Sequence, residues 1–403
     1  MRIFFFTQYF WPENFRINEI VNYFRKSKNK LTVLTGYPSY PHKKIYKNFR
    51  EKNEIISNSE FKIIRVPIIP RSDSNISIIL NYISFIISSF FYGFMAFFKK
   101  KFDVIFLFCP SPILSVLPAV FLNKIFKKKM VIWILDLWPN TIIDLKIIKN
   151  KYLIKIMKIV VKFIYNNTDL ILAQSKSIKE EIEKITSTKC IYFPSWPEEG
   201  VSKGDVDFVM DLKNKNKTKT KIIFAGNIGE AQSFETLIEA AKIVKKYHLV
   251  EWIILGDGRW KKNLINLIKE NDLSDHIKII NAVPSSKVKF YLDQADALYL
   301  SLKKNDTFKK TIPGKLSTYM FSEKPIIASI SGETSKIINQ ADCGFASEAE
   351  NYNALAENVI KFTRLSEEDK KKLGINAKNY VSKYFEKKNI LNNLELEIKK
   401  IIN

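Results

Sequence analysis

The sequence has few of the residues that bind metal ions or form disulfides. It contains three cysteines and three histidines in 403 residues. Three widely separated cysteines cannot form a disulfide framework or a four-thiolate zinc site, and three histidines are too few for a histidine-rich centre. Asp205 and Asp207 form an Asp-x-Asp pair of the kind that binds metals, but they lie in a polar stretch and not at a strand end. We therefore expect no metal ion and no cofactor.

Acidic residues are in the minority. The chain has 65 lysines and arginines against 41 aspartates and glutamates, which gives a net charge of +24. Such an excess attracts nucleic acid, an anionic membrane surface or a phosphorylated substrate. The basic runs consist of lysine rather than arginine, and the sequence contains no recognisable nucleic-acid-binding module. We expect no nucleic-acid partner, which leaves the membrane and the phosphorylated substrate.

The length corresponds to about two domains. Short apolar runs alternate with amphipathic stretches, which predicts an α/β protein with parallel sheets in two Rossmann-like domains facing a central cleft. We place the first domain at residues 1–195, a polar linker at 196–220, the second domain at 221–375 and terminal helices at 376–403. Strands are expected at residues 2–6, 30–34, 62–66, 103–108, 130–135, 169–173 and 190–193, and then at 221–225, 251–255, 277–280, 297–300 and 325–328.

The first predicted strand follows Met1 directly, without a cleavable signal, so we expect a cytoplasmic protein. One segment, Ile76 to Phe98, has no charged residue and ends at Lys99. As a helix it would be about 35 Å long, enough to cross a bilayer. Crossing would place parts of one sheet on opposite sides of the membrane. We therefore favour a helix lying in the membrane interface, with a buried core helix and a spanning helix as the alternatives.

Polar residues follow two predicted strands of the first domain. Glu13, Asn14 and Arg16 come after the first strand, where they either face a ligand or, in the case of Asn14, cap the next helix. Asp136 follows the strand at 130–135 directly. A carboxylate in that position acts as a base or binds a hydroxyl group, although it also caps turns.

Glycine-containing turns follow two strands of the second domain. Such turns let backbone N–H groups approach a phosphate at a helix N-terminus. The spacing of a dinucleotide fingerprint is missing, so two neighbouring turns predict a nucleotide but not NAD. The residues concerned are Gly226, Asn227, Gly229, Gln232, Asp257, Gly258 and Arg259.

A third turn contains Pro313 and Gly314 and starts a helix with Lys315 in its first turn. A cation gains nothing from the helix dipole there, so an anion would explain Lys315 better than solvent does. Lys310, just upstream, is a second candidate for that anion. The alternative is a solvated lysine in a lysine-rich chain.

Several motifs together resemble one family, the retaining GT-B glycosyltransferases of family 4, in the branch that includes L-fucosamine transferases of O-antigen and colanic-acid-type clusters. The resemblance implies a UDP-linked sugar donor, best matched by UDP-N-acetyl-L-fucosamine, held without metal mainly by the second domain. It also implies an undecaprenyl-diphosphate-linked glycan acceptor at the anionic inner membrane, and terminal helices that return toward the first domain. The motifs are residues 9–16 (YFWPENFR), 31–41 (LTVLTGYPSYP), 136–139 (DLWP), 226–232 (GNIGEAQ), 256–258 (GDG) and 313–328.

On this resemblance we expect retaining transfer of a hexosyl or N-acetylamino sugar by an enzyme attached peripherally to the inner face of the plasma membrane. Asp136 and Glu13 would be catalytic, Asn14 and Arg16 would bind the acceptor, and the glycine turns and lysines would bind the donor. The family's two glutamates are replaced by Lys309 and Ser317. The alternatives are a nucleotide-sugar epimerase of the same fold and a membrane-surface protein that binds anionic polymers without catalysis.

Overall fold

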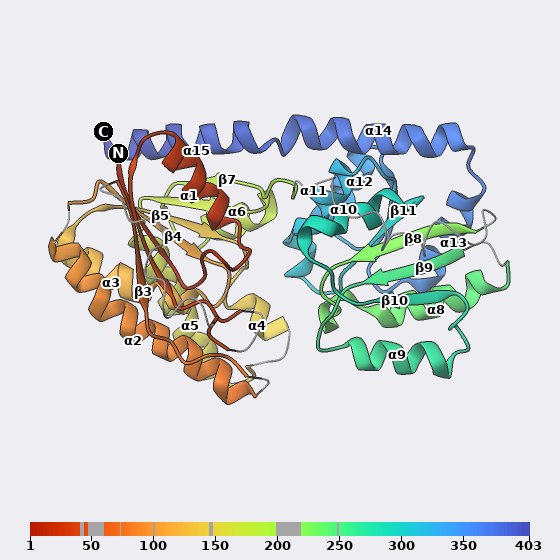
Figure 1. Ribbon diagram of the computed structural model, residues 1–403, viewed down its shortest axis with the longest axis horizontal. Helices are drawn as coiled ribbons and strands as arrows, with labels where there is room; N and C mark the ends of the chain where they lie inside the picture. The colour runs from red at the N-terminus through yellow and green to blue at the C-terminus, as the bar shows by residue number, and fades with distance from the viewer. Residues whose placement is uncertain are drawn as a thin grey trace. The chain divides into compact units, whose positions relative to one another are not determined.

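The computed structural model describes the chain except for residues 41–43, 47–59, 73, 100, 145–147, 199–218 and 248–249. Asp205 and Asp207 lie outside the described residues. The chain divides into two compact units (Figure 1). The first unit is Met1–Phe193 together with Lys388–Asn403, and the second is Pro194–Lys387. All three cysteines are buried and free.

The first unit contains a seven-stranded sheet in the order β3-β2-β1-β4-β5-β6-β7. Every pairing is parallel. The central strands are almost entirely apolar because helices cover both faces of a parallel sheet. The strands are β1 (Arg2–Thr7), β2 (Lys30–Gly36), β3 (Phe61–Val66), β4 (Val104–Cys109), β5 (Lys129–Ile134), β6 (Leu170–Ala173) and β7 (Cys190–Tyr192).

The helices of the first unit carry one apolar face each toward this sheet. Helix α1, for example, buries Ile17, Ile20, Val21 and Phe24, which recur at helical spacing. The helices are α1 (Ile17–Lys26), α2 (Asn75–Lys99), α3 (Leu117–Phe126) after the 3-10 turn η2 (Ile113–Val116), α4 (Asn140–Asp144), α5 (Lys151–Asn166), α6 (Lys176–Glu183) and α15 (Lys387–Ile402).

The second unit contains a six-stranded parallel sheet in the order β10-β9-β8-β11-β12-β13. Its strands are β8 (Thr220–Ala225), β9 (Val250–Leu255), β10 (Ile277–Ile280), β11 (Ala297–Ser301), β12 (Ile326–Ser329) and β13 (Gly344–Ser347). Its helices are η4 (Glu230–Gln232), α8 (Phe234–Lys245), α9 (Lys261–Glu270), α10 (Ser285–Asp293), η5 (Phe308–Lys310), α11 (Gly314–Phe321), α12 (Glu333–Gln340), α13 (Tyr352–Thr363) and α14 (Glu367–Tyr384).

In each sheet the strand order reverses beside the first strand, at β1/β4 and at β8/β11. Ligands of open parallel sheets bind outside the carboxyl ends of the strands at such a switch point. The predicted fold class, α/β with two Rossmann-like parallel sheets, is confirmed. The switch points direct attention to the loops after β1 and β4 in the first unit and after β8 and β11 in the second.

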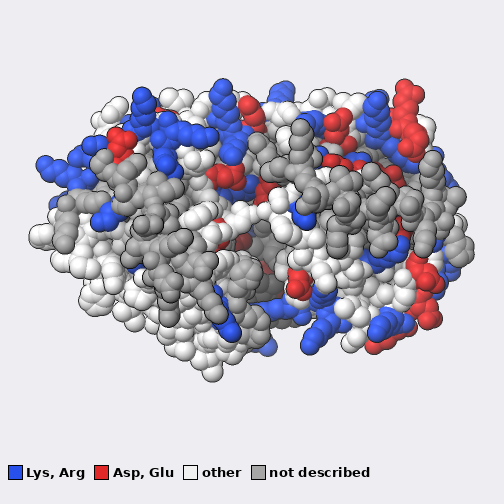
Figure 2. Space-filling view, viewed as in Figure 1, with Lys and Arg blue, Asp and Glu red and all other residues white. Residues whose placement is uncertain are grey.

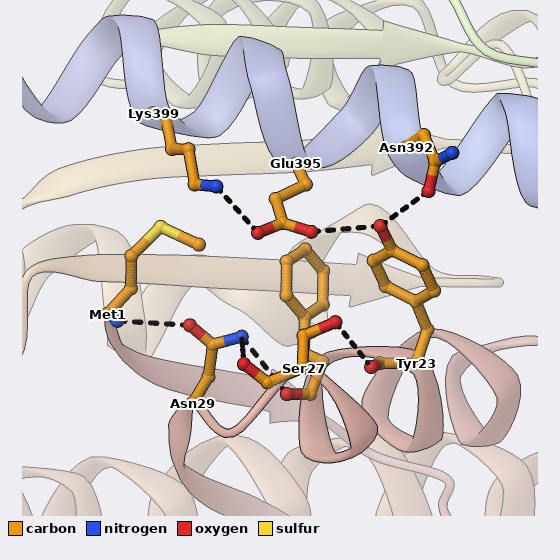
Figure 3. Close-up of polar contacts among 8 residues, drawn as sticks. Met1, Tyr23, Ser27, Asn29, Asn392, Glu395 and Lys399 are labelled. Carbon is orange, nitrogen blue, oxygen red and sulfur yellow. Dashed lines mark hydrogen bonds and ion pairs between the residues drawn. The ribbon is translucent and has the colours of Figure 1, made fainter.

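The chain ends on the first unit, where α15 lies against α1 (Figure 3). The Tyr23 hydroxyl on α1 lies 2.8 Å from Asn392 Oδ1 and 2.8 Å from Glu395 Oε2, and Glu395 also pairs with Lys399 at 2.8 Å. A second ion pair joins Lys189, before β7, to Glu397. Residue 375, where the sequence analysis ended the second domain, lies inside α14, so the helical element continues across that predicted boundary.

Helix α2 covers the apolar segment Ile76–Phe98, of which 22% is buried. Its buried stripe contacts the sheet through Phe85, 5.7 Å from Phe6, and Phe97, 4.9 Å from Phe4, measured between ring centroids. A spanning helix is excluded in this fold, because β1 before α2 and β4 after it pair directly within one sheet. Helix α2 is not a buried core helix either, since only one of its faces is buried.

The other face of α2 is apolar and exposed. The part of Figure 2 where α2 lies is mostly uncharged surface. Eleven large apolar side chains there have exposed fractions between 37% for Tyr92 and 75% for Phe98. They are Ile76, Ile79, Leu80, Ile83, Ile87, Phe90, Phe91, Tyr92, Phe94, Met95 and Phe98.

Candidate functional site

The loops after β8 and β9 hold each other at the switch point of the second sheet. The Gly226 N–H donates to Leu255 O at 2.8 Å, and the Ile228 N–H donates to Asp257 O at 2.8 Å. A Cβ on Gly256 would lie 1.9 Å from Gly226 O, and Gly256 has φ of +159°. The two loops approach too closely for any side chain at that position, which explains the glycine.

These contacts correct the predicted role of the glycine turns. The N–H of Gly226 is used between the loops and does not face a ligand. The N–H of Gly229 donates to Gln232 Oε1 at 3.0 Å, and that of Gly258 to Asp257 Oδ1 at 2.8 Å. These two acceptors are side chains, so a phosphate can replace them, whereas it cannot replace the backbone acceptor of Gly226.

Lys315 lies against the first of these loops. It is the second residue of α11, and its Nζ lies 3.9 Å from the centre of the Phe224 ring. A Cβ on Gly226 would meet Lys315 Cε at 2.4 Å, so the absence of a side chain at Gly226 makes room for the lysine. Burial lowers the pKa of Lys315 to about 7.

No carboxylate pairs with Lys315 in the part of the chain that the structure describes. A half-buried cation without a counter-charge, in the first turn of a helix, is unfavourable by itself. A phosphate beside Gly226 would supply that charge and would gain from both the ammonium group and the helix N-terminus. The arrangement therefore fits an anion.

The remaining predicted donor residues surround this point or lie in solvent. Asn227 belongs to the site because a Cβ on Gly258 would lie 2.8 Å from its Oδ1. Asp257 and Arg259 are exposed, and Asp257 lies 3.8 Å from Lys261 Nζ. Lys310 ends the short turn η5 and is half-buried.

The two positions that replace the family's glutamates serve local structure. Lys309 pairs with Asp306 at 3.0 Å on the surface. Ser317 is buried, and its hydroxyl donates to Gly314 O at 3.1 Å within α11. Neither position offers a carboxylate to a sugar. The nearby Tyr319 hydroxyl is also used, because it donates to Ala225 O and accepts from the Ala225 N–H.

In the first unit, Asp136 follows β5, the neighbour of β4 in the sheet. Its side chain makes no hydrogen bond or ion pair with any described residue. Burial raises the pKa of Asp136 to about 6. An unpaired carboxylate with that pKa at a strand end is suited to accept a proton or a hydroxyl hydrogen bond near neutral pH.

Glu13 is buried and is used by the backbone of its own unit. Its Oε1 accepts from the N–H groups of Ser39 at 2.9 Å and Tyr40 at 2.8 Å, and its Oε2 from Phe10 at 3.3 Å. Desolvation by burial raises the pKa of Glu13, against these hydrogen bonds, which lower it. The contacts show that Glu13 positions the loops after β1 and β2, and its predicted catalytic role stays a prediction.

Asn14 and Arg16 share that loop but differ in their contacts. Asn14 is exposed, and no side chain caps α1, so the alternative of a cap by Asn14 is wrong. Arg16 pairs with Glu19 at 2.9 Å. The residue that ties the loop to α1 is Asn18, which sequence reasoning missed. It donates to Glu13 O at 2.7 Å and accepts from the Trp11 N–H at 2.9 Å.

The structure thus brings Gly226, Asn227, Gly258 and Lys315 together in the second unit. In the first unit it places Asp136 and the Glu13 loop at strand ends separated by β4. Across the described ranges, no cluster of three or more His, Cys, Asp or Glu side chains could hold a metal ion.

Comparisons with known proteins agree with this geometry. Residues 206–380 match the family described as Glycosyl transferases group 1. The chain is 25% identical over 323 residues to the putative colanic acid biosynthesis glycosyl transferase WcaI of Escherichia coli K12, covering 75% of each chain.

Solved structures resemble the whole chain. Sucrose-phosphate synthase from Thermosynechococcus elongatus superposes with a TM-score of 0.75 at 14% identity, covering 99% of this chain and 98% of that one. Anabaena HepE, solved in complex with UDP and glucose, superposes with a TM-score of 0.71 at 12% identity, covering 99% and 100%. At these identities the likeness shows the fold, which is GT-B.

Proposed function

We propose that this chain, whose residues 206–380 match the group 1 glycosyl transferases, transfers a sugar from a nucleotide-sugar donor to a lipid-linked oligosaccharide in the synthesis of a bacterial surface polysaccharide. The single observation that carries the proposal is Lys315, a half-buried cation beside Gly226 at the β8/β11 switch point that pairs with no carboxylate of the described chain. Its place and charge fit the diphosphate of such a donor.

The donor is UDP-linked in this proposal. HepE, which shares the fold, was solved with UDP, and the motifs after β8 and β9 resemble those of UDP-sugar transferases. The sugar is N-acetyl-L-fucosamine, on the resemblance of the motifs at residues 9–16 and 136–139 to that branch. Lys315 would neutralise the leaving diphosphate, a task for which no metal is required.

Asp136 faces the acceptor in this proposal and holds the attacking hydroxyl. Transfer with retention of configuration lets the leaving phosphate take the hydroxyl proton, so Asp136 acts by orienting the hydroxyl and sharing its proton. WcaI, the relative from Escherichia coli, is named for colanic acid biosynthesis, which supports a surface polysaccharide as the product.

A thermal-shift panel of nucleotides and nucleotide sugars tests the donor. A ligand present at 100 times its Kd adds about 2.7 kcal/mol to stability, or about 5 to 10 °C for a unit of this size. We expect UDP to raise the melting temperature without added metal, and UDP-N-acetyl-L-fucosamine to raise it further. A panel in which GDP and ADP sugars stabilise the chain and UDP does not would contradict the proposed donor.

Incubation of the protein with a UDP-N-acetylhexosamine and no acceptor separates transfer from epimerisation. We expect no rapid epimerisation, followed by transfer when a lipid-linked acceptor is added. Rapid epimerisation without acceptor would replace the proposed function by that of an epimerase. Absence of any UDP-sugar binding would favour a protein that only binds anionic polymers.

We further propose that the first unit attaches to the cytoplasmic face of the plasma membrane through three helices. The exposed face of α2 continues onto α3 and α5, because Phe94 lies 6.3 Å from Phe126, and Phe121 lies 5.4 Å from Phe163. Helices α2, α3 and α5 contain no acidic residue. Exposed apolar side chains on α3 and α5 are Phe121, Ile125, Tyr152, Leu153, Ile156 and Ile159.

Helix α5 also supplies the charge for this attachment. Its exposed lysines at positions 151, 155, 158 and 162 recur every three or four residues, so they form one row along the helix. Each lysine near an anionic bilayer contributes about 1 kcal/mol. Apolar side chains beside a lysine row are typical of elements that lie in the membrane interface.

Replacing Ile87 and Phe91 by glutamate tests the attachment. These side chains are 54% and 62% exposed, so the fold tolerates the change, while the apolar contact with lipid is lost and two charges repel the headgroups. We expect the fraction that sediments with anionic vesicles to fall roughly tenfold. High salt should release only part of the unmodified protein, since salt screens the lysines but not the apolar contact.

The matched control replaces Tyr352 and Leu396, which are 41% and 56% exposed outside this surface, by glutamate. It changes the net charge equally, and we expect it to sediment as the unmodified protein does. Equal loss in both double variants would mean that charge alone holds the protein to the vesicles, and no loss in either would refute the proposed surface.

A further inference from the structure

Arg71 lies in a cage of aromatic rings in the first unit. The centre of its guanidinium group is 4.8 Å from the Tyr82 ring, 5.4 Å from the Tyr9 ring and 5.9 Å from the Tyr40 ring. Tyr9 follows β1, Tyr40 follows β2, and Tyr82 belongs to α2. Three segments that are far apart in the sequence therefore converge on one arginine.

Among the residues that the structure describes, Arg71 has no carboxylate partner. Its hydrogen bonds go to neutral groups, from Nε to Asn81 Oδ1 at 3.3 Å and from Nη2 to the Tyr82 hydroxyl. A guanidinium group has five N–H donors, so two bonds leave three unused within the described ranges. Glu13, the carboxylate of the neighbouring loop, is already used by three backbone N–H groups.

The partners of Arg71 are themselves fixed. Asn81 accepts from Gln8 Nε2 at 2.7 Å and donates to Ile69 O at 2.6 Å. The Tyr9 ring stacks on Phe15 at 4.8 Å, and the buried Tyr9 hydroxyl has no hydrogen-bond partner among the described residues. The cage is formed before any ligand binds, which reduces the entropic cost of binding.

The cage around Arg71 is suited to bind an anion. The guanidinium group is half-buried, no carboxylate of the described residues neutralises its charge, and the Tyr9 hydroxyl group of the cage has no hydrogen-bond partner among those residues. Planar guanidinium groups bind phosphate oxygens in pairs and stack on aromatic rings at the same time. The rings hold the cation in place while its remaining N–H groups stay available.

The position of the cage specifies what else the anion carries. Tyr82 lies one helical turn from Ile79, and Ile79, Leu80 and Ile83 begin the exposed apolar face of α2. The cage also adjoins the end of β1, at the switch point of the first sheet. An anion bound here meets apolar surface on one side and the predicted acceptor loop on the other.

We propose that Arg71, Tyr9, Tyr40 and Tyr82 form a binding site for the phosphate or diphosphate group of a lipid-linked substrate, with its chain lying along α2. The identification of that substrate as the acceptor rests on the proposed function. The binding site itself rests on the cage and on the apolar face beside it.

Flotation with neutral phosphatidylcholine vesicles containing undecaprenyl diphosphate tests the site. We expect the protein to bind them more tightly than vesicles that carry the same charge as phosphatidylglycerol. Arg71→Gln should weaken binding to the undecaprenyl diphosphate vesicles roughly tenfold, the effect of losing one or two charge-assisted hydrogen bonds. Its binding to phosphatidylglycerol vesicles should change less than twofold.

Arg25→Gln is the matched control. Arg25 also lies over an aromatic ring of the first unit, 5.4 Å from the centre of Phe61, but it is exposed at the end of α1. Arg25→Gln removes the same charge as Arg71→Gln. We expect it to bind the undecaprenyl diphosphate vesicles and the phosphatidylglycerol vesicles as the unmodified protein does. Arg71→Lys keeps the charge without the paired donors, and we expect it to lose most of the selectivity for undecaprenyl diphosphate while remaining folded.

Free inorganic diphosphate distinguishes the sources of the anion. We expect it to compete only at concentrations far above those of the lipid, because it gains nothing from α2. If free diphosphate competed as well as the lipid does, the lipid-linked assignment would be overturned. It would also be overturned if Arg71→Gln weakened binding to both vesicle types equally. Binding by Arg71→Gln and Arg71→Lys as strong as that of the unmodified protein would overturn the site.

The transferase assay separates this inference from the proposed function. If both hold, Arg71→Gln raises the KM for the acceptor roughly tenfold and leaves the KM for the donor unchanged. Selective loss of lipid binding in a protein without transferase activity would retain the site and reject the proposed function. If Arg71→Gln kept transferase activity with an unchanged KM for the acceptor, the proposed function would be retained and the site rejected.

Discussion

Lys315→Ala is expected to lower kcat/KM for the donor by about 100-fold to 1000-fold. In the proposed function the ammonium group lies where negative charge develops on the leaving diphosphate, and removal of one such charge-stabilising group costs about 3 to 4 kcal/mol in a preorganised site. UDP affinity should fall as well, by roughly tenfold, because the ammonium contacts the diphosphate before transfer too. Steady-state kinetics and a UDP titration measure the two effects.

The expected pH dependence follows from the lowered pKa. The Lys315 amine is charged below about pH 7 in the free protein and neutral above it. An anion binds the charged form, so UDP affinity should decline as the pH rises from 7 to 9, and binding at pH 8 should take up a proton. Titration calorimetry at pH 8 in two buffers of different ionisation enthalpy detects that uptake, and Lys315→Ala should abolish it.

Lys361→Ala is the control for this prediction. Lys361 also lies over an aromatic ring of the second unit, with Nζ 4.9 Å from the centre of Phe345, but it is exposed on α13. The variant should retain donor kinetics and UDP affinity. If Lys315→Ala behaved like this control, the donor diphosphate would be held elsewhere and the central observation of the proposed function would fail.

The strand ends could be predicted from the sequence, whereas the contacts at those ends could not. Residues 130–134 and 222–225 are continuously apolar, as buried parallel strands must be, so Asp136 and Gly226, which follow them, could be placed at the carboxyl edges of sheets. Strand β13, which is absent from the predicted strands, contains a glycine and is only half-buried at the edge of its sheet.

The roles of individual side chains depended on partners that are distant in sequence. The loop-positioning role of Glu13 could not be predicted, because two of the three N–H groups that it binds belong to Ser39 and Tyr40, 26 and 27 residues away. Gly226 was expected to present its N–H to a phosphate, but Leu255 O on the neighbouring loop accepts it. Arg71 carried no motif at all, since its cage comes from three separate segments. Residue type and strand-end position predict where a site lies, and the packing decides which group is left free.

Asp136→Asn is expected to lower turnover at least tenfold and to stabilise the protein at the same time. In the proposed function this variant loses the carboxylate that orients the acceptor hydroxyl. General base contributions are typically 100-fold to 10,000-fold, and we take about tenfold as the lower bound for an orienting role. Donor affinity should not change, because Asp136 lies in the first unit and the donor site in the second.

The gain in stability follows from the raised pKa of Asp136. The folded protein binds the proton up to about pH 6, whereas the unfolded chain releases it near the ordinary value of 3.8. Stability is therefore lost as the pH rises from about 4 to 6 and stays lost above that. A neutral amide avoids the loss, so at pH 7 to 8 the variant should be more stable by about 3 kcal/mol. The difference should close as the pH falls to 4.

Asp103→Asn, in the same unit, is expected to change stability in the opposite direction from Asp136→Asn. Arg2 hydrogen-bonds to this carboxylate and thereby lowers the pKa of Asp103, so its charged form is the favoured one in the folded protein. Its amide variant should be less stable than the unmodified protein at pH 7, with unchanged turnover.

Melting temperatures and turnover of the unmodified protein, Asp136→Asn and Asp103→Asn, measured between pH 4 and 8, test the predicted effects on stability and on catalysis. If Asp136→Asn lost stability as Asp103→Asn does, its carboxylate would be paired and structural. The acceptor hydroxyl would then have to be oriented by another group of the first unit.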